Sequence, residues 1–80
     1  MKILYFASIR DWLKCDQEQV EIENPITIND FIRIHLNPRL NGKKIDNFLF
    51  AVNEELVDKS FKLSDDDTLA ILPPLSGGNL

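Results

Sequence analysis

The apolar residues of this chain fall in short runs, and this pattern constrains the fold more than any other feature of the sequence. Lys2–Ala7, Leu49–Val52 and Thr68–Leu72 are runs of four to six residues rich in β-branched and aromatic side chains, which is typical of strands. Helical spacing of apolar residues is found in the stretch Ile28–Leu36. Because one helix cannot cover both faces of a sheet, the sequence predicts an α+β domain with the helix on one face.

The predicted helix has a recognisable beginning and end. Thr27 can cap its first turn, and Asp30 three residues later approximates a capping box. Pro38 is expected to end it, since proline has no N–H to donate. Its apolar stripe consists of Ile28, Phe31, Ile32 and either His35 or Leu36.

The remaining segments complete a mixed sheet. Gln19–Glu23 alternates apolar and polar residues and is predicted to be a half-buried strand, separated from the first by a gap that suits a hairpin. Asn53-Glu54-Glu55 is predicted to turn the chain into a short strand at Leu56-Val57. The order strand, strand, helix, strand, strand, strand is the layout of the ubiquitin-like β-grasp fold. We expect this domain, with about five strands, over residues 1–74, and a flexible tail over residues 75–80.

Length, charge and cysteine content exclude several classes of function. With 80 residues and one cysteine, the chain has no room for a separate cofactor domain and forms neither an internal disulfide nor a zinc site of several thiolates. A net charge of −4 makes it a poor ligand for nucleic-acid phosphates. No apolar run approaches the roughly 20 residues of a membrane span. We therefore expect a small soluble domain, located in the cytoplasm, with no nucleic-acid or membrane partner.

Three features that resemble catalytic or metal-binding residues are better explained without chemistry. His35 has no nucleophile near it in sequence and is interpreted as a helix surface residue. Cys15 has Lys14 as its only adjacent cation, which is weak support for a reactive thiol. Asp65–Asp67 lacks the spacers and the glycine of a hard-cation loop and is interpreted as a solvated turn. The chain is therefore not expected to be an enzyme by itself, and no bound cofactor or metal is expected.

The C-terminal segment has a more unusual composition. Pro73-Pro74 stops strand pairing and favours an extended exit from the sheet. Gly77 and Gly78 lack Cβ atoms, so their backbone could pass through a narrow channel in another protein. By itself, a Gly-Gly pair near a terminus is equally consistent with a frayed end.

Four segments together resemble one family. They are Phe6-Ala7-Ser8-Ile9-Arg10-Asp11, Ala51-Val52-Asn53-Glu54-Glu55-Leu56-Val57, Leu63-Ser64-Asp65-Asp66-Asp67-Thr68-Leu69-Ala70 and Leu72-Pro73-Pro74-Leu75-Ser76-Gly77-Gly78. In this order they resemble the small subunits of molybdopterin synthase, which are sulfur carriers of the MoaD type. The Pro-Pro-x-Ser-Gly-Gly ending is the most specific part of the resemblance.

The resemblance implies that Gly78 is the acyl carrier and Gly77 the flexible residue before it. In this family, an E1-like adenylyltransferase uses ATP to adenylate the terminal glycine, and sulfur from a donor system displaces AMP to leave a thiocarboxylate. The carrier then docks on the large synthase subunit, in a heterotetramer. There the sulfur passes to cyclic pyranopterin monophosphate to build the molybdopterin dithiolene.

The resemblance also implies a docking face. Leu4 and Phe6 are predicted to point away from the helix, and an uncovered apolar strand face marks an interaction site. In relatives, residues at the positions of Phe6, Leu56 and Leu72 contact both the activating enzyme and the large subunit. The tail residues expected to bind the partners are Pro73, Pro74, Leu75 and Ser76. For Phe6, Leu56 and Leu72, ordinary core packing is the alternative. Arg10 could add a polar contact at the rim or be a surface charge.

The sequence departs from the family after Gly78, because Asn79-Leu80 follow it. While they are attached, the Gly78 carbonyl is part of a peptide bond and cannot be adenylated. They could be a cloning remnant, a natural end removed by a protease, or the mark of a copy that binds partners without carrying sulfur. Two other functions stay open: a sulfur carrier for thiamin synthesis or tRNA thiolation, and a β-grasp binding module without acyl chemistry.

Overall fold

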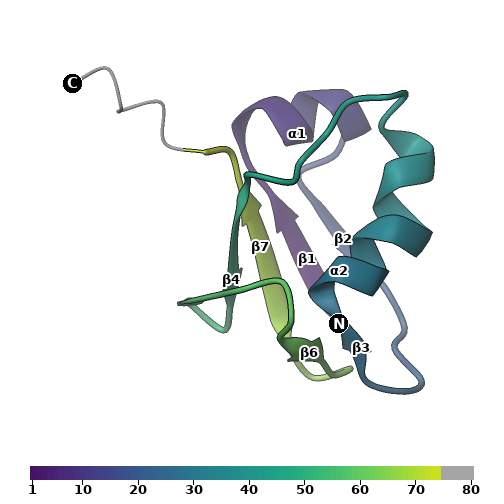
Figure 1. The fold of residues 1–80 in the computed structure, drawn as a ribbon, viewed down its shortest axis with the longest axis vertical. Coiled ribbons are helices and arrows are strands. Elements are labelled where there is room, and N and C mark those ends of the chain that lie inside the picture. The colour runs from purple at the N-terminus through teal and green to yellow at the C-terminus, as the bar shows by residue number, and fades with distance from the viewer. Residues whose placement is uncertain (75–80) are drawn as a thin grey trace.

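The central feature of the fold is a mixed sheet in which one pair of adjacent strands runs parallel (Figure 1). The computed structural model describes residues 1–74, and within them this sheet has five strands in the order β2-β1-β7-β4-β5. Its strands are β1 (Lys2–Tyr5), β2 (Gln17–Gln19), β4 (Leu49–Val52), β5 (Glu55–Val57) and β7 (Thr68–Leu72). β1 and β7 are parallel, and every other neighbouring pair is antiparallel. This is the β-grasp arrangement that the sequence predicted.

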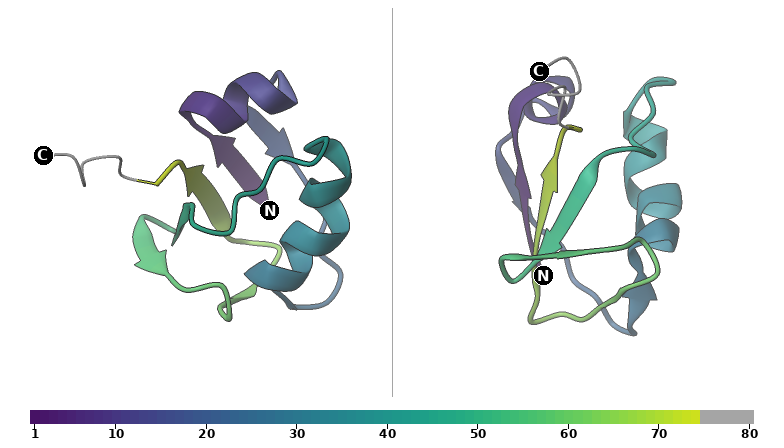
Figure 2. Two further views of the ribbon diagram at one scale, coloured as in Figure 1. Left: turned by 45° about the horizontal axis from the view of Figure 1, so that its top comes forward. Right: turned by 60° about the vertical axis from the view of Figure 1, so that its left-hand side comes forward.

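One face of the sheet is covered by a long helical segment, as the right-hand view of Figure 2 shows. It begins as α2 (Ile28–Phe31), continues as a π-helical turn η1 (Ile32–Leu36) and ends in a 3-10 turn η2 (Asn37–Arg39). The predicted cap is confirmed, because Thr27 Oγ1 accepts a hydrogen bond from the Asp30 N–H at 3.1 Å. Pro38 does not end the helical segment as predicted. It lies in the first turn of η2, where the backbone N–H groups make no hydrogen bond within the helix, so proline is tolerated there.

The core lies between this helical segment and the inner face of the sheet. The predicted stripe is buried at Ile28, Phe31, Ile32 and Leu36, whereas His35 is exposed. Opposite them, alternate strand residues are buried: Ile3, Tyr5, Phe50, Val52, Leu69 and Ile71. Leu40, Ile45 and Phe48 from the loop before β4 complete the core. These contacts anchor β7, and therefore fix the point at which the C-terminal segment leaves the sheet.

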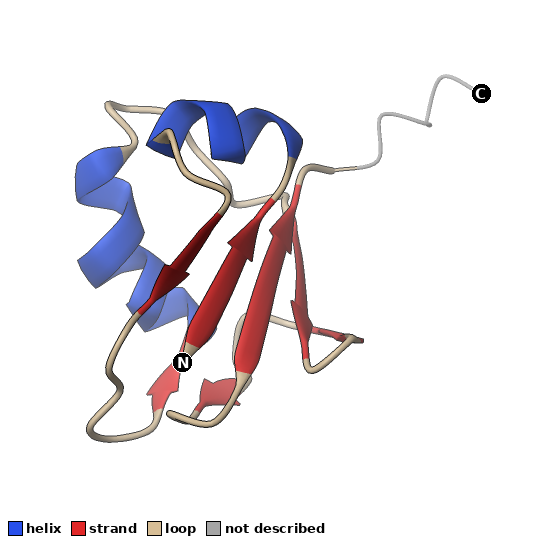
Figure 3. Ribbon diagram, turned by 180° about the vertical axis from the view of Figure 1, so that it is seen from behind, coloured by secondary structure: helices blue, strands red, loops and turns tan. Residues whose placement is uncertain are grey.

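A second helix, α1 (Ala7–Leu13), was missed by the sequence analysis, which expected a short hairpin between β1 and β2. Figure 3 shows it across one end of the sheet. Its signal was present, since Ile9 is buried and Trp12 and Leu13 pack against the core at helical spacing. The strand-like run Lys2–Ala7 hid the start of the helix, because β1 ends at Tyr5 and Ala7 turns the chain at φ 52°.

The second strand was also placed too late in the chain. Gln17–Gln19 forms β2, whereas the alternating residues Val20 and Ile22 pack against the core without forming part of a strand. Two short strands that were not predicted, β3 (Ile26–Thr27) and β6 (Lys62–Leu63), pair antiparallel beside α2. Segments of two or three residues are too short for a periodicity to be read from sequence.

A three-residue network ties the end of the helical segment to the sheet. Tyr5 Oη donates to Glu18 Oε1 at 2.6 Å, and Arg39 donates to both Glu18 carboxylate oxygens at 2.9 and 3.0 Å. The Arg39 hydrogen bonds hold the pKa of Glu18 below its usual value. Burial, together with the Glu18 hydrogen bond, raises the pKa of Tyr5. Over residues 1–74, no helix is both long enough and apolar enough to cross a membrane.

Candidate docking face and tail exit

The face of the sheet opposite the helices carries a row of apolar side chains. In β7, Leu69 and Ile71 are buried against the core, so Thr68, Ala70 and Leu72 lie on the opposite face. The strand register places Leu4 and Ala51 on either side of Ala70, and Leu56 next to Ala51. Because registered residues share a face, Leu4, Ala70, Ala51 and Leu56 form a continuous row across four strands, which we call the apolar row.

A second apolar group lies where β7 ends. Leu72 is registered with Leu49 of β4, and Phe6 follows directly after β1, whose last residue is registered with Ile71. At the opposite end of the same face, Lys2 is registered with Thr68, so that end is polar. Figure 3, which looks onto this face, shows the chain leaving β7 at the apolar end. The C-terminal segment therefore begins beside the more apolar half of the face.

The three predicted docking residues lie on this face with different exposure. Leu56 is 69% exposed and Phe6 is 40% exposed, while Leu72 is half-buried. As expected, Leu4 and Phe6 point away from the helical layer. The alternative, that Phe6 and Leu56 are ordinary core residues, does not fit these exposures. Their contact with a partner remains a prediction.

A hydrogen-bonded turn holds Leu56 in place. Asn53 and Glu54, which join β4 to β5, have positive φ angles of 52° and 73°, as a tight hairpin turn requires. Asn53 Oδ1 accepts from the Thr68 N–H at 3.0 Å, and Asn53 Nδ2 donates to Asp67 Oδ1 at 3.0 Å. The hairpin is thus fixed to the start of β7, and the apolar row stays aligned across both.

The acidic segment Asp65–Asp67, interpreted from sequence as a solvated turn, has structural contacts as well. Asp67 Oδ2 accepts from the Ser64 N–H at 2.8 Å, and Asp65 Oδ1 accepts from the Ile22 N–H at 2.8 Å. The Ile22 hydrogen bond and the nearby N-terminal ammonium lower the pKa of Asp65. Among the described residues, no group of three or more histidine, cysteine or acidic side chains is arranged to hold a metal ion.

The other residues that the sequence singled out do not come together in a site. His35 stacks on Phe31, with ring centroids 4.8 Å apart. Cys15 is half-buried with a free thiol. Arg10 lies in α1 with its guanidinium 3.9 Å from the Asp11 carboxylate, both exposed. None of these three is placed to act on another.

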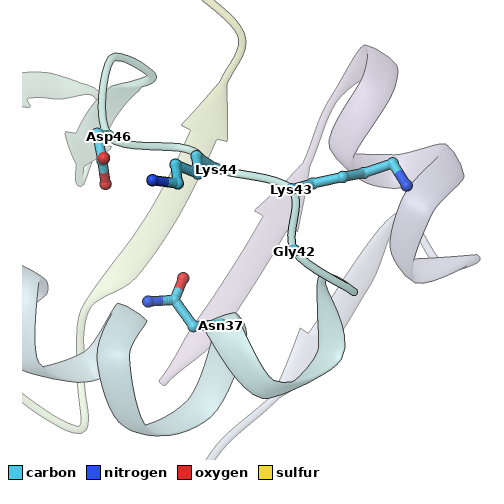
Figure 4. Close-up of a pocket in the computed structure, with 5 residues that line it drawn as sticks. All are labelled: Asn37, Gly42, Lys43, Lys44 and Asp46. Atoms are coloured by element: carbon cyan, nitrogen blue, oxygen red, sulfur yellow. The ribbon is translucent and has the colours of Figure 1, made fainter.

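A polar hollow lies on the helical side of the molecule (Figure 4), lined by Asn37, Gly42, Lys43, Lys44 and Asp46. The Lys43 side chain extends away from it, and its ammonium lies 5.6 Å from the centre of the Trp12 ring. The hollow therefore contains a single lysine ammonium, and Asp46 faces the same space. This arrangement provides neither a nucleophile with a base nor a strong anion site.

The predicted tail is described only in its first two residues. Pro73 and Pro74 directly follow β7 and are half-buried, whereas Leu75, Ser76, Gly77 and Gly78 lie outside the described residues. Sequence analysis missed three residues of the face: Leu49, Ala51 and Ala70. The alternation along β4 and β7 was the signal that could have found them, because it separates inward from outward positions.

Comparison with known proteins places the whole described domain in a defined group. The model of the ThiS family matches residues 3–78. A curated molybdopterin synthase sulfur carrier subunit from Chlamydomonas reinhardtii is 34% identical, covering 98% of this chain and 98% of its own length. The protein of that name from Escherichia coli K12 is 29% identical, covering 98% and 99%. A solved structure from Pyrococcus furiosus, described as a molybdopterin converting factor subunit 1, superposes with a TM-score of 0.74 at 26% identity, covering 92% of this chain and 95% of its own.

Proposed function

The chain belongs to the ThiS family, and we propose that it is the sulfur-carrier small subunit of a molybdopterin synthase. The observation that carries the proposal is that β7 ends at the apolar end of the exposed face, and that Pro73-Pro74-Leu75-Ser76-Gly77-Gly78 follows it in the sequence. The family match runs through Gly78, and the curated relatives with full-length coverage carry the same name. We expect the complex to be a heterotetramer in the cytoplasm.

In this proposal the working group is the Gly78 carboxylate. A carboxylate is a poor electrophile because its charge is delocalised, so an E1-like adenylyltransferase first joins it to the AMP part of ATP, which releases pyrophosphate. Sulfur from a donor system then attacks the acyl carbon and displaces AMP, which leaves a thiocarboxylate. That sulfur is finally transferred to cyclic pyranopterin monophosphate in the large subunit.

The protein itself then has two tasks, to present Gly78 and to dock. Glycine at the acyl position offers the least steric hindrance, and Gly77 allows the backbone to pass through a narrow channel. Phe6, Leu56 and Leu72 supply apolar area beside the exit of the tail, and Pro73 to Ser76 supply the tail contacts. In this proposal the substrate pocket, the basic residues and the acid–base groups come from the partners.

The proposal requires Gly78 to be the last residue when it is activated. The test compares the 80-residue chain with a version that ends at Gly78, each incubated with ATP, sulfide and the activating enzyme and then weighed by mass spectrometry. We expect a gain of about 16 Da, the exchange of one oxygen for sulfur, in the shorter protein only. Equal gains in both proteins would contradict the assignment of Gly78.

A second experiment identifies the synthase. The thiocarboxylated protein is mixed with the molybdopterin synthase large subunit of the same organism and cyclic pyranopterin monophosphate, and dithiolene formation is measured. Product formation that is lost when Gly77-Gly78 are deleted supports the proposal. If the thiocarboxylate forms but passes its sulfur only to a thiazole synthase or a tRNA-thiolating enzyme, the chain is a carrier of another pathway.

A further inference from the structure

Part of the exposed sheet face is hollow rather than flat. The hollow, of about 360 Å³, is lined by Leu4, Ala70, Thr68, Asn53 and Glu54. Its floor is low where Ala70 lines it, because alanine has a short side chain. A side chain from outside can therefore enter between Leu4 and the Asn53-Glu54 turn.

The hollow is apolar on one side and acidic on the other. Leu4 and Ala70 are the apolar side, and both are half-buried in the free protein. The Glu54 carboxylate stands at the opposite rim and makes no ion pair with any residue that the structure describes. The Asp67 carboxylate accepts a hydrogen bond from Asn53 Nδ2 at 3.0 Å. Lys2 is registered with Thr68 and limits the acidic region to the hairpin side.

The amide of Asn53 is held in place, because its oxygen accepts from the Thr68 N–H and its nitrogen donates to Asp67. Glu54 is the charged residue among those that line the hollow, so an electrostatic contact with a partner at this rim falls to Glu54. A carboxylate next to an apolar floor selects an apolar side chain that has a cation close to it. The hollow shares Leu4 and Ala70 with the apolar row and therefore lies on the same face as Leu56.

We infer that this hollow is the specificity pocket of the docking face, and that it receives one bulky apolar side chain of the large subunit, flanked by a lysine or arginine that pairs with Glu54. The inference rests on the proposed function, because it names the large subunit as the partner. Ala70 sets how much side chain can enter, and Glu54 sets the charge of its neighbour. Neither residue takes part in sulfur chemistry.

The test measures the affinity of the large subunit for variants of the 80-residue chain by isothermal titration calorimetry. Ala70→Leu fills the hollow, and we expect the dissociation constant to rise on the order of tenfold. Ala70→Val fills it less and should give an intermediate rise. Gln17→Leu is the matched control, since Gln17 is registered with Leu4 at the far edge of the same row, outside the hollow. It should leave the affinity unchanged.

A second arm tests the charge. Glu54→Gln should weaken binding about threefold at low salt, and the difference should disappear at high salt, where a surface pair is screened. Glu23→Gln, which removes an exposed carboxylate elsewhere, is the control. Unchanged thermal midpoints for all variants exclude unfolding as the cause of weaker binding. If Ala70→Leu unfolds, the comparison is made with Ala70→Val instead.

The outcomes separate the two claims. If the unaltered chain binds the large subunit and Ala70→Leu binds equally well, the pocket is refuted while the proposed function stands. If the unaltered chain does not bind the large subunit, the proposed function fails and the inference fails with it. Weaker binding by both Ala70→Leu and Gln17→Leu would also refute the pocket, because bulk anywhere on the face would then suffice.

Discussion

Replacing Leu56 with alanine should separate docking from folding. Full burial of a leucine side chain stabilises by about 1.5–3 kcal/mol, and 69% of Leu56 is still exposed in the free protein. A partner that covers it completely therefore gains about 1–2 kcal/mol from this side chain. Its loss should raise the dissociation constant for the large subunit by roughly 5- to 30-fold, with little change in the free energy of unfolding.

The same reasoning predicts a different balance for Phe6. Because Phe6 is 40% exposed, burial of the exposed part of its side chain on docking can contribute only about 0.6–1.2 kcal/mol. The larger part of the side chain is already buried and contributes to folding. Phe6→Ala should therefore weaken docking less than Leu56→Ala and destabilise the fold more. Ile34→Ala is the matched control, because Ile34 is 48% exposed but lies in η1, on the helical side.

Two measurements on the same samples separate the effect on folding from the effect on docking. Chemical unfolding gives the stability, and calorimetric titration with the large subunit gives the affinity. The reasoning is refuted if Leu56→Ala destabilises the free protein by more than Phe6→Ala does. It is also refuted if Ile34→Ala weakens docking as much as Leu56→Ala, since exposure alone, rather than the sheet face, would then govern binding.

Three further predictions concern the fold itself. Glu18→Gln should lower stability at pH 7 by about 1 kcal/mol, because it removes the charged pair with Arg39. Since the Arg39 hydrogen bonds hold the folded-state pKa of Glu18 below its ordinary value, the stabilisation from Glu18 is present above the unfolded-state pKa and is lost as the pH falls through the folded-state pKa. The difference from the unaltered protein should therefore shrink in urea titrations between pH 5 and pH 3, and a constant difference would contradict the assignment. Asn53→Ala should destabilise by about 1–2 kcal/mol, measured by thermal unfolding, because it removes two hydrogen bonds and leaves alanine at a positive φ; a neutral result would show that the turn does not hold the hairpin. Lys14→Gly should stabilise by up to about 1 kcal/mol, because Lys14 ends α1 at φ 62°, where glycine is favoured; a lower melting temperature would contradict this.

The sheet and the main helix could be predicted because their signals are local and repeated. β4 and β7 were predicted with their observed bounds, and Thr27 was identified as the cap, since each pattern depends on neighbouring residues in the chain. α1 was not predicted, because the apolar run of β1 continues through Phe6 and Ala7. The boundary between β1 and α1 is marked by the positive φ angle of Ala7, not by a change in composition. A change in backbone angle of this kind cannot be predicted from the pattern of apolar and polar residues.

The site divides in the same way. Phe6, Leu56 and Leu72 were found because they stand out as large apolar residues in a recognisable family pattern. Ala51 and Ala70 were not found, since an alanine in a strand carries no signal of its own. They matter only because the register of four strands places them side by side between two leucines, and register between distant strands is a property of the folded chain.

The geometry of the exit explains why a carrier needs a folded domain at all. From Pro73 to Gly78 there are six residues, and an extended chain spans at most about 3.3–3.6 Å per residue, so Gly78 stays within roughly 22 Å of the end of β7. Any reaction pocket that receives Gly78 must lie within that distance of Leu72, Leu49 and Phe6. A partner that binds the face therefore holds the glycine at a high effective concentration, even where the tail alone binds weakly. In the proposed function the domain thus makes the terminal glycine a local reagent, and we propose that the same face serves the activating enzyme and the large subunit in turn.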